Sequence, residues 1–577
     1  MLDTELEALR SRFEALRSDK TPIVAVWDQI ETYVMPLTGK DSARQQTAPN
    51  QTTDDVVWDL TAPLAAEHLA ASLHGNVTSP ASRWVDFEWD ELELEKDQAA
   101  VRHREALAQV VWSALQASDF NSEIAAGYNE HASLGNMVLM CEPLDPNEWK
   151  GLDFTSIPDR EAFLEEDALG GIYRAFRLLR WSAVQCLDKF GEGTPEEIKK
   201  KAALPTGGTT KLDVVFAVFR RKDIPEWTPT GDVKSDLLPV EKRPFGGVYF
   251  TLEGCLQLGD DLGFYEMPIV HARWNRMPGS IWGFGRGHLA LRNVKFLNGY
   301  KELARAQAAC AVAPRMVATQ RGIESTVNLG PGGVTVGDPA DVKVIESTGR
   351  FDVSAEVIQD ERMEIRRAFH EDDLQLKESP AMTATEVQAR RDMMDRVLGS
   401  PVGRLQTEAL VPVVFLVLRL LYRAGKLPAA PQSVKAKKAE LRVKFRGPIA
   451  RAQAMDQVVA IERSAAFISN LFKLGFEESK YYFDVGAAVR EHSRLLGVPA
   501  TILRSEDEAK KLKDVDMQAA RAAMAAETAK NAAQAGKAGA EAATMMAGGG
   551  GGAAPAGGAV LPFAPQAALV PSGAQLP

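Results

Sequence analysis

One helix near the middle of the chain constrains the fold most, because its apolar residues are too widely spread to be covered from one side. The spacing predicts a helix from about His288 to Val312. A helix that packs against a single neighbour carries one apolar stripe. We therefore expect this helix to be covered on more than one side. Its apolar positions are Leu289, Leu291, Val294, Phe296, Leu297, Tyr300, Leu303 and Cys310.

Glycines mark both ends of this central helix. Gly283, Gly285 and Gly287 open it, in a stretch that predicts a tight turn from a strand into the helix. Beyond the helix, residues 322–336 predict two short strands about a turn. The turn residues are Gly330, Pro331, Gly332 and Gly333.

Two more helices are expected after that hairpin. The first spans about residues 354–370 and has Ile358, Ile365 and Phe369 on one face. The next begins at Thr383, because Thr383 and Glu386 have the spacing of a capping box.

Three sequence blocks resemble the portal proteins of podoviruses, the T7-like head-to-tail connectors. Trp282-Gly-Phe-Gly-Arg-Gly287 is similar to the entry of that family's stem helix. Met382–Val387 and Leu398–Gln406 are similar to its best-kept block, and Arg446–Gln453 resembles a third. The resemblance runs from about residue 5 to residue 500. Its motif residues are Gly283, Gly285, Gly287, Thr383, Glu386, Gly399, Gly403, Arg404 and Gln406.

The resemblance implies an α+β, mostly helical portal fold that assembles as a cyclic ring. The expected parts are an N-terminal wing (1–282), a stem helix (283–312), a clip (313–352), a second stem helix (353–370), a channel loop (371–381), crown and wing-return helices (382–515) and an Ala/Gly-rich tail (516–577).

The same resemblance implies a function and partners. The chain would be a portal subunit at one capsid vertex, a conduit for double-stranded DNA during packaging and ejection. Its partners would be copies of itself in a ring, expected to be a dodecamer, and the terminase large subunit. Tail or adaptor proteins, capsid and scaffolding proteins would also bind it. It would reside in the virion after assembly in the host cytoplasm, without catalysis, cofactor or membrane contact.

Composition sets independent limits on these expectations. The formal net charge is −11 and the pI is near 5.5, which argues against a protein whose whole surface grips nucleic acid. The four cysteines are far apart, so neither a zinc site nor a disulfide framework is indicated. The longest apolar run, Leu410 to Leu421, contains Pro412 and Arg419 and falls short of about 20 residues that span a bilayer.

The remaining chain predicts a coarse secondary structure. Helices are expected at 2–17, 23–34, 60–73, 97–117, 120–133, 181–189, 194–203, 403–424, 449–475 and 484–496. Strands are expected at 85–89, 212–218, 248–252, 264–274 and 441–446 within or beside an α+β region over 137–275. Residues 516–547 have high helix propensity without a large apolar face, and residues from 548 onward form a low-complexity tail.

Several charged groups are candidates to face DNA. In the strand 441–446, Arg442, Lys444 and Arg446 alternate with apolar residues, and a solvated or intersubunit salt-bridge face is the alternative. On the central helix the candidates are Arg292 and Lys295, with ordinary surface charges as the alternative. The channel loop should project inward, and its candidates are Glu371, Asp372, Asp373 and Lys377.

Two other classes of function stay open from the residues alone. Gly283–Gly287 could cradle a phosphate in a nucleotide-binding enzyme, although the spacing G-x-G-x-G differs from the usual fingerprint. A cytoplasmic scaffolding oligomer without a DNA channel is the other rival. His370-Glu-Asp-Asp373 contains metal-ligand residue types, but a solvated helix end is favoured because consecutive side chains diverge. No constellation for covalent or acid–base catalysis is found.

Overall fold

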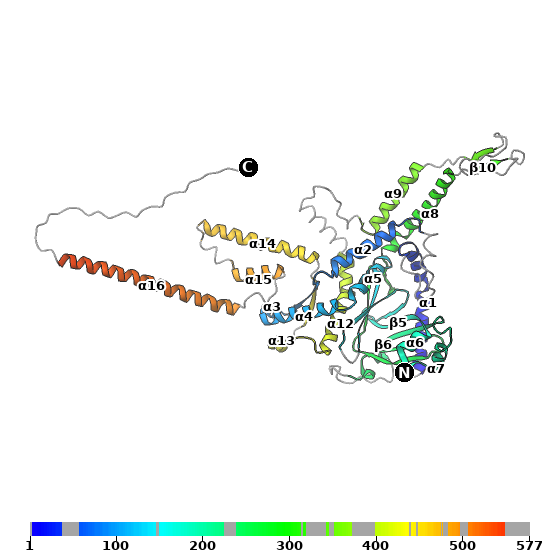
Figure 1. Cartoon of the computed structure of the whole chain (residues 1–577), viewed down its shortest axis with the longest axis horizontal. Helices are drawn as coiled ribbons and strands as arrows, with labels where there is room; N and C mark the ends of the chain where they lie inside the picture. The colour runs from blue at the N-terminus through cyan, green and yellow to red at the C-terminus, as the bar shows by residue number, and fades with distance from the viewer. Residues whose placement is uncertain are drawn as a thin grey trace. The chain divides into compact units, whose positions relative to one another are not determined.

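The computed structural model of the chain separates into two compact units, residues 1–502 and 503–577 (Figure 1). The structure describes residues 3–36, 57–145, 149–223, 238–312, 315–318, 342–345, 351–371, 399–437, 440–445, 448–474, 476, 483–496 and 506–547. The first unit mixes helices and antiparallel sheets and contains every strand described. This confirms the expected α+β, mostly helical class.

The N-terminal part of the first unit is helical. Its elements are α1 (Asp3–Tyr33), α2 (Thr61–Val77), α3 (Leu92–Lys96), α4 (Gln98–Gln116) and α5 (Phe120–Ser133). The sequence suggested two separate helices at 2–17 and 23–34, whereas α1 is continuous through Pro22. Pro22 is tolerated because it lies on the exposed face, where the carbonyl of Ser18 that lacks a helical donor can face water.

A five-stranded antiparallel sheet forms the larger part of the core, in the order β4-β5-β6-β7-β8. Its strands are β4 (Ala162–Glu166), β5 (Ile172–Ser182), β6 (Lys211–Arg220), β7 (Phe245–Thr251) and β8 (Gln257–Phe264). Val215, Ala217 and Phe219 of β6 pack with Leu9 and Phe13 of α1, so α1 covers one face. The alternate residues of β6 belong to the main core on the other face.

A three-stranded sheet, β3-β2-β9, lies beside α5 and leads toward the central helix. It consists of β2 (Asn136–Pro143), β3 (Leu152–Ile157) and β9 (Ile269–Arg273). The single strand expected over 264–274 is therefore wrong. The chain leaves the larger sheet after Phe264 and enters the smaller one at Ile269, with Pro268 between them. Two short helices, α6 (Ala183–Phe190) and α7 (Glu196–Ala202), follow β5 as expected.

The central helix and its partner form an arm. Helices α8 (Arg286–Val312) and α9 (Phe351–Ala368) lie side by side (Figure 1). Between them, β10 (Arg315–Ala318) pairs antiparallel with β11 (Val342–Ile345). Every pair in this register has residue 330 at its midpoint, which agrees with a turn at Gly330–Gly333. Those four turn residues themselves lie outside the described residues.

The chain after the arm returns to the sheets. A helix from Gly399 passes through a π-helical turn (Gln406–Leu410) into α12 (Val411–Arg423). The wide turn accommodates Pro412, so the apolar run is not interrupted as the sequence suggested. By length and composition alone, the 25-residue helix Gly399–Arg423 could cross a membrane. Val413, Val414 and Val417 are fully buried within the unit, as in a core helix.

The remaining elements extend from this core. They are α13 (Gln432–Lys437), β12 (Leu441–Phe445), α14 (Pro448–Lys473) and α15 (Val485–Leu496). Strand β12 pairs antiparallel with β1 (Val85–Trp89), a partner some 350 residues earlier in the chain. In the second unit, α16 (Glu506–Ala547) is a single helix, and residues 508–537 are exposed along its whole circumference.

Candidate functional site

The glycine turn at the base of the arm is packed against backbone. A Cβ on Gly283 would lie 2.7 Å from Gly135 O, one on Gly285 would lie 2.6 Å from Gly135 N, and one on Gly287 would lie 2.5 Å from Ser133 O. Real Cβ atoms do not approach so closely, so only glycine fits at these three positions. The turn therefore seats the start of α8 directly on the turn between α5 and β2.

The backbone donors of this turn already have acceptors within the chain. Gly283 N donates to Asn136 Oδ1 at 2.7 Å, and Phe284 N donates to Asn275 O at 3.1 Å. Gly285 N donates to Leu134 O at 3.1 Å. A phosphate cradle needs these N–H groups unoccupied and aimed at the ligand. The turn is thus the packed strand-to-helix connection expected by default, and the geometry argues against the nucleotide-binding alternative.

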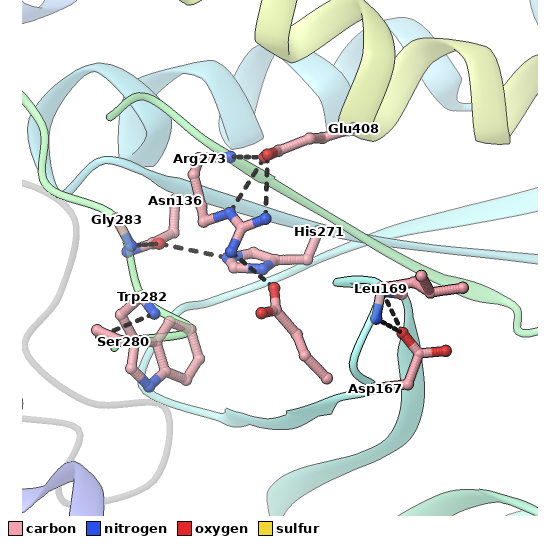
Figure 2. A network of polar contacts seen from close by, with 11 residues as sticks. Asn136, Asp167, Leu169, His271, Arg273, Ser280, Trp282, Gly283 and Glu408 are labelled. Atoms are coloured by element: carbon pink, nitrogen blue, oxygen red, sulfur yellow. Dashed lines mark hydrogen bonds and ion pairs between the residues drawn. The ribbon is translucent and has the colours of Figure 1, made fainter. Parts of the chain in front are cut away.

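A buried ion-pair network joins the two sheets to the helix Gly399–Arg423 (Figure 2). The guanidinium of Arg273, on β9, donates to Glu408 at 3.0 and 3.2 Å and to Glu166 at 2.7 Å. Its backbone N–H also donates to Glu408, at 2.9 Å. Burial raises the pKa of Glu166, and the neighbouring Arg273 opposes that rise. One arginine thereby fixes the ends of β4, β9 and the π-helical turn relative to one another.

Asn136 and His271 connect that network to the glycine turn, as Figure 2 shows. Asn136 Oδ1 accepts from Gly283 and lies 3.3 Å from His271 Nε2. Because His271 is fully buried, its pKa falls to about 3. The neutral imidazole is therefore a structural donor at this joint rather than a titrating group near neutral pH.

A buried lysine forms a second joint, between α1 and the entry of α8. The ammonium of Lys20 donates to the carbonyls of Asp159 and Ala162. It also lies 4.3 Å from the ring of Trp282 and 4.4 Å from that of Phe163, which are favourable positions for a cation. Burial lowers the pKa of Lys20 to about 7 despite the nearby Asp159 carboxylate.

A third joint ties α8 to α9 through one carboxylate. Asp59 is 2% exposed and pairs with Lys301 of α8 at 2.7 Å and Arg362 of α9 at 2.9 Å. Although burial opposes it, hydrogen bonding to Lys301, Thr61 and Arg362 lowers the pKa of Asp59 to about 2. The segment before α2 is held in turn by buried Asn298, whose side-chain oxygen accepts from the N–H groups of Trp58 and Asp59.

The two candidate cations on α8 differ in their surroundings. Arg292 is exposed between Leu289 and Phe296. Lys295 instead donates to Gln29 of α1 and lies 6.0 Å from the ring of Tyr33. Arg292 therefore has the freer side chain, whereas Lys295 also serves contact within the chain.

The start of the predicted channel loop is anchored rather than solvated. Glu371 is 8% exposed, lies 3.0 Å from His68 Nδ1 of α2 and pairs with Arg366 at 3.6 Å. His370 before it has a positive φ of 57°, which reverses the chain after α9. In the part of the chain that the structure describes, no group of three or more His, Cys, Asp or Glu side chains could hold a metal ion.

The basic strand is matched by acids of its partner strand. In the β1–β12 pair, Arg442 faces Glu88 and pairs with Asp90, and Lys444 pairs with Glu88 at 3.4 Å. This arrangement corresponds to a salt-bridge face, formed here within one subunit. It reduces the charge available to phosphates, while contact of these residues with DNA stays a prediction.

Other expected site residues are only partly covered by the structure. Asp372, Asp373, Lys377, Thr383, Glu386 and Arg446 lie outside the described residues. The glycines Gly399 and Gly403 lie in the helix before the π-helical turn, with open space where a Cβ would stand. Arg404 precedes the turn, and Gln406 begins it. The motif block thus leads directly into the turn that presents Glu408 to Arg273.

Sequence reasoning missed the residues that hold the base of the arm. Lys20 had a signal, because it interrupts the apolar stripe Phe13, Leu16, Ile23 and Trp27 at helical spacing. Glu408 had one too, as a lone acid at the head of a strongly apolar helix. Asn136, Asp59 and Arg273 had none that separates them from surface residues, because their partners are distant in sequence.

These contacts define a class of protein: a structural subunit whose arm of two helices is locked to a mixed wing by packed glycines and buried ion pairs. Residues 6–503 match the family model described as bacteriophage head to tail connecting protein. The chain belongs to this family.

Similar proteins include two from bacteriophages. The portal protein of Salmonella phage epsilon15 is 22% identical over 91% of this chain and 93% of its own length. The probable portal protein of Bordetella phage BPP-1 is 24% identical over 90% of this chain and 93% of its own.

Solved structures show a more distant likeness. A chain from the virion of a native gene transfer agent particle matches 70% of this chain and 84% of its own, with 11% identity and a TM-score of 0.28. A chain from the neck of the native particle, computed with C12 symmetry, matches 70% and 89%, with 12% identity and a TM-score of 0.29. The family assignment rests on the sequence matches.

Proposed function

We propose that the chain is a portal subunit, which forms a ring at one capsid vertex and conducts double-stranded DNA during packaging and ejection. One observation carries the proposal. The family match over residues 6–503 spans the whole arm, from the packed glycine turn through α8, β10, β11 and α9. The similar phage proteins, which cover most of the chain, are themselves named as portal proteins. The function is mechanical, without a catalytic step.

Exposed apolar side chains support assembly into a ring. Phe467 of α14 is 64% exposed, Val485 of α15 is 64% exposed, and Leu474 between them is 74% exposed. Large apolar patches on a subunit mark surfaces that a partner covers. A head-to-tail contact of this kind closes into a ring when its rotation closes, and we propose a dodecamer.

The end of the arm is the proposed docking point for partners. The clip, residues 313–352, includes the β10–β11 ribbon and the predicted turn at Gly330–Gly333. A ribbon at the tip of two helices can present backbone and turn atoms to another protein. We assign it contacts with the terminase large subunit during packaging and with tail or adaptor proteins later. Capsid and scaffolding proteins would contact the wing during assembly in the host cytoplasm.

The channel should hold DNA loosely. A ring of about twelve copies repeats the formal charge of −11 per chain, a field that repels DNA at long range. The remaining candidates for the few contacts are the channel-loop charges Asp372, Asp373 and Lys377, together with Arg446. Arg442 and Lys444 are weaker candidates because Asp90 and Glu88 already pair with them.

The first experiment is imaging of the purified full-length protein by negative-stain electron microscopy. The proposal expects closed rings with a central hole, seen face-on. Sedimentation of a monodisperse monomer across micromolar concentrations would contradict it. Closed assemblies without a hole would favour the scaffolding alternative instead.

The second experiment measures binding of the purified ring to duplex DNA at several salt concentrations. We expect weak binding at physiological salt and a shallow salt dependence, because few phosphates are neutralised. Tight binding with a steep loss as salt rises would mean many phosphate contacts and would overturn the loose-conduit account.

A further inference from the structure

Helix α8 has two apolar faces, and the chain covers only one of them. Ala290, Val294 and Leu297 are at most 2% exposed, on the side where α8 contacts α1, α2, α5 and α9. Leu289, Phe296 and Leu303 are 63%, 50% and 69% exposed. They recur every seven residues, so they form one stripe along the helix, which we call the α8 stripe.

Such a stripe is typical of a helix that packs on another helix. Apolar residues at heptad spacing keep one seam facing a partner over several turns. Phe296 also stacks on Tyr300 of the next turn, with ring centroids 5.8 Å apart, which holds its ring in a fixed position. Among the residues that the structure describes in the first unit, none covers the three stripe residues beyond partial exposure.

The open face of α9 is the complementary surface. Met363 is 42% exposed, and Glu356 and Asp360 stand exposed on the same side, one and two turns before it. This set is called the α9 face below. The charged residue within the α8 stripe is Arg292, between Leu289 and Phe296. A basic stripe and an acidic face attract each other, whereas two copies of either surface would repel.

The heights of the two surfaces also agree. Asn293 of α8 hydrogen-bonds Glu364 of α9 within one chain, and the two helices run in opposite directions on either side of the β10–β11 ribbon. Phe296 therefore lies level with the turn of α9 that contains Asp360 and Met363. A rotation about an axis roughly parallel to the arm keeps this level, so the same residues of neighbouring copies can meet.

We propose that the α8 stripe of one copy docks on the α9 face of a second copy, with Phe296 against Met363 and Arg292 beside Asp360. This inference rests on the proposed ring and names the surfaces that build it. The two surfaces differ, so the contact is heterologous and repeats from copy to copy. It also moves Arg292 from the DNA-facing candidates to the subunit contact.

Cysteine cross-linking tests the contact in the full-length protein. The double variant Phe296→Cys with Met363→Cys is oxidised and run on a denaturing gel without reductant. We expect a ladder of multimers, since each disulfide joins two copies. The control pairs Leu204→Cys with Met363→Cys, because Leu204 is 57% exposed but lies outside the arm. That control should give no ladder.

The outcomes separate the two levels of the argument. If the unmodified protein forms rings and the Phe296/Met363 variant stays monomeric on the gel, the interface is wrong while the proposed function stands. If the unmodified protein never forms rings, the proposed function itself fails. A ladder that is equally strong in the Leu204 control would also overturn the interface.

A charge swap gives a second, independent measurement. Arg292→Glu and Asp360→Arg are each expected to raise the concentration needed for ring formation by about tenfold, and the double variant should restore it. Both residues are exposed, so neither change threatens folding of the subunit. Single variants that form rings like the unmodified protein, or a double variant that stays defective, would overturn the pairing of Arg292 with Asp360.

Discussion

Replacing Asp59 by Asn should loosen the arm selectively, because this carboxylate is the shared partner of α8 and α9. Its pKa of about 2, against an ordinary 3.8, reflects a preference for the charged form in the folded state. At about 1.4 kcal/mol per pH unit, the difference corresponds to about 2 kcal/mol. Lys301 and Arg362 have side chains that are 22% and 27% exposed, so solvent screening reduces that value to between about 1 and 2 kcal/mol.

Hydrogen exchange followed by mass spectrometry measures this locally. A loss of about 1 to 2 kcal/mol should speed exchange in peptides of α8 and α9 by about 5-fold to 30-fold, while β6 and β7 stay unchanged. The matched control is Glu67→Gln, which removes an exposed carboxylate from α2. An unchanged arm in Asp59→Asn, or faster exchange spread evenly over the unit, would refute the reasoning.

The same ion pairs give a pH dependence with a definite sign. The pKa of Asp59 is lowered by folding, so its contribution is fully present above the unfolded value near 3.8 and disappears as the pH falls toward about 2. Protection of α8 and α9 should therefore decline across this acidic range in the unmodified protein. The decline should be smaller in Asp59→Asn, which has no proton to gain at this position.

Three further predictions concern the glycine turn, the clip and the tail. Gly285→Ala should cost about 2 to 4 kcal/mol of stability, because its Cβ would lie 2.6 Å from backbone, whereas Gly299→Ala on the same helix meets open space and should be neutral or stabilising in thermal unfolding. Replacing residues 326–336 by a short Gly/Ser linker should preserve ring formation at least partly and abolish tail attachment, so particles that still attach tails would contradict the clip assignment. Limited proteolysis should trim residues from 548 onward first, and cleavage in 37–55 with an intact tail would contradict that expectation.

The sequence predicted those elements whose pattern is complete within one stretch. Alternation located β1, β6 and β7, and helical spacing located α5, α8 and α9, because each of these buries a face that its own residues define. The breadth of the apolar set on α8 also predicted more than one covered side. The described chain covers Ala290, Val294 and Leu297 but leaves Leu289, Phe296 and Leu303 exposed, so the second cover stays a prediction for the assembly.

What could not be predicted depends on partners far apart in the chain. The basic face of residues 441–446 suggested DNA contact, whereas the structure pairs Arg442 and Lys444 with acids of β1. A signal was present, since Asp86, Glu88 and Asp90 alternate in the same way as the basic residues. Local pattern does not reveal that two such strands are neighbours, because strand pairing is decided by the packing of the whole unit.

The base of the arm shows why directional contacts matter for a mechanical subunit. Apolar packing tolerates repacking and small rotations, whereas a buried hydrogen bond or ion pair is satisfied in one arrangement only. Arg273 fixes β9 to Glu166 and Glu408, Asn136 fixes β2 to the glycine turn, and Asp59 fixes α8 to α9. A force applied at the clip must therefore pass through α8 into these joints before it can rotate the arm against the sheets. The angle of the arm is thus specified by a few polar side chains, and substitutions there should change ring geometry before they change the secondary structure.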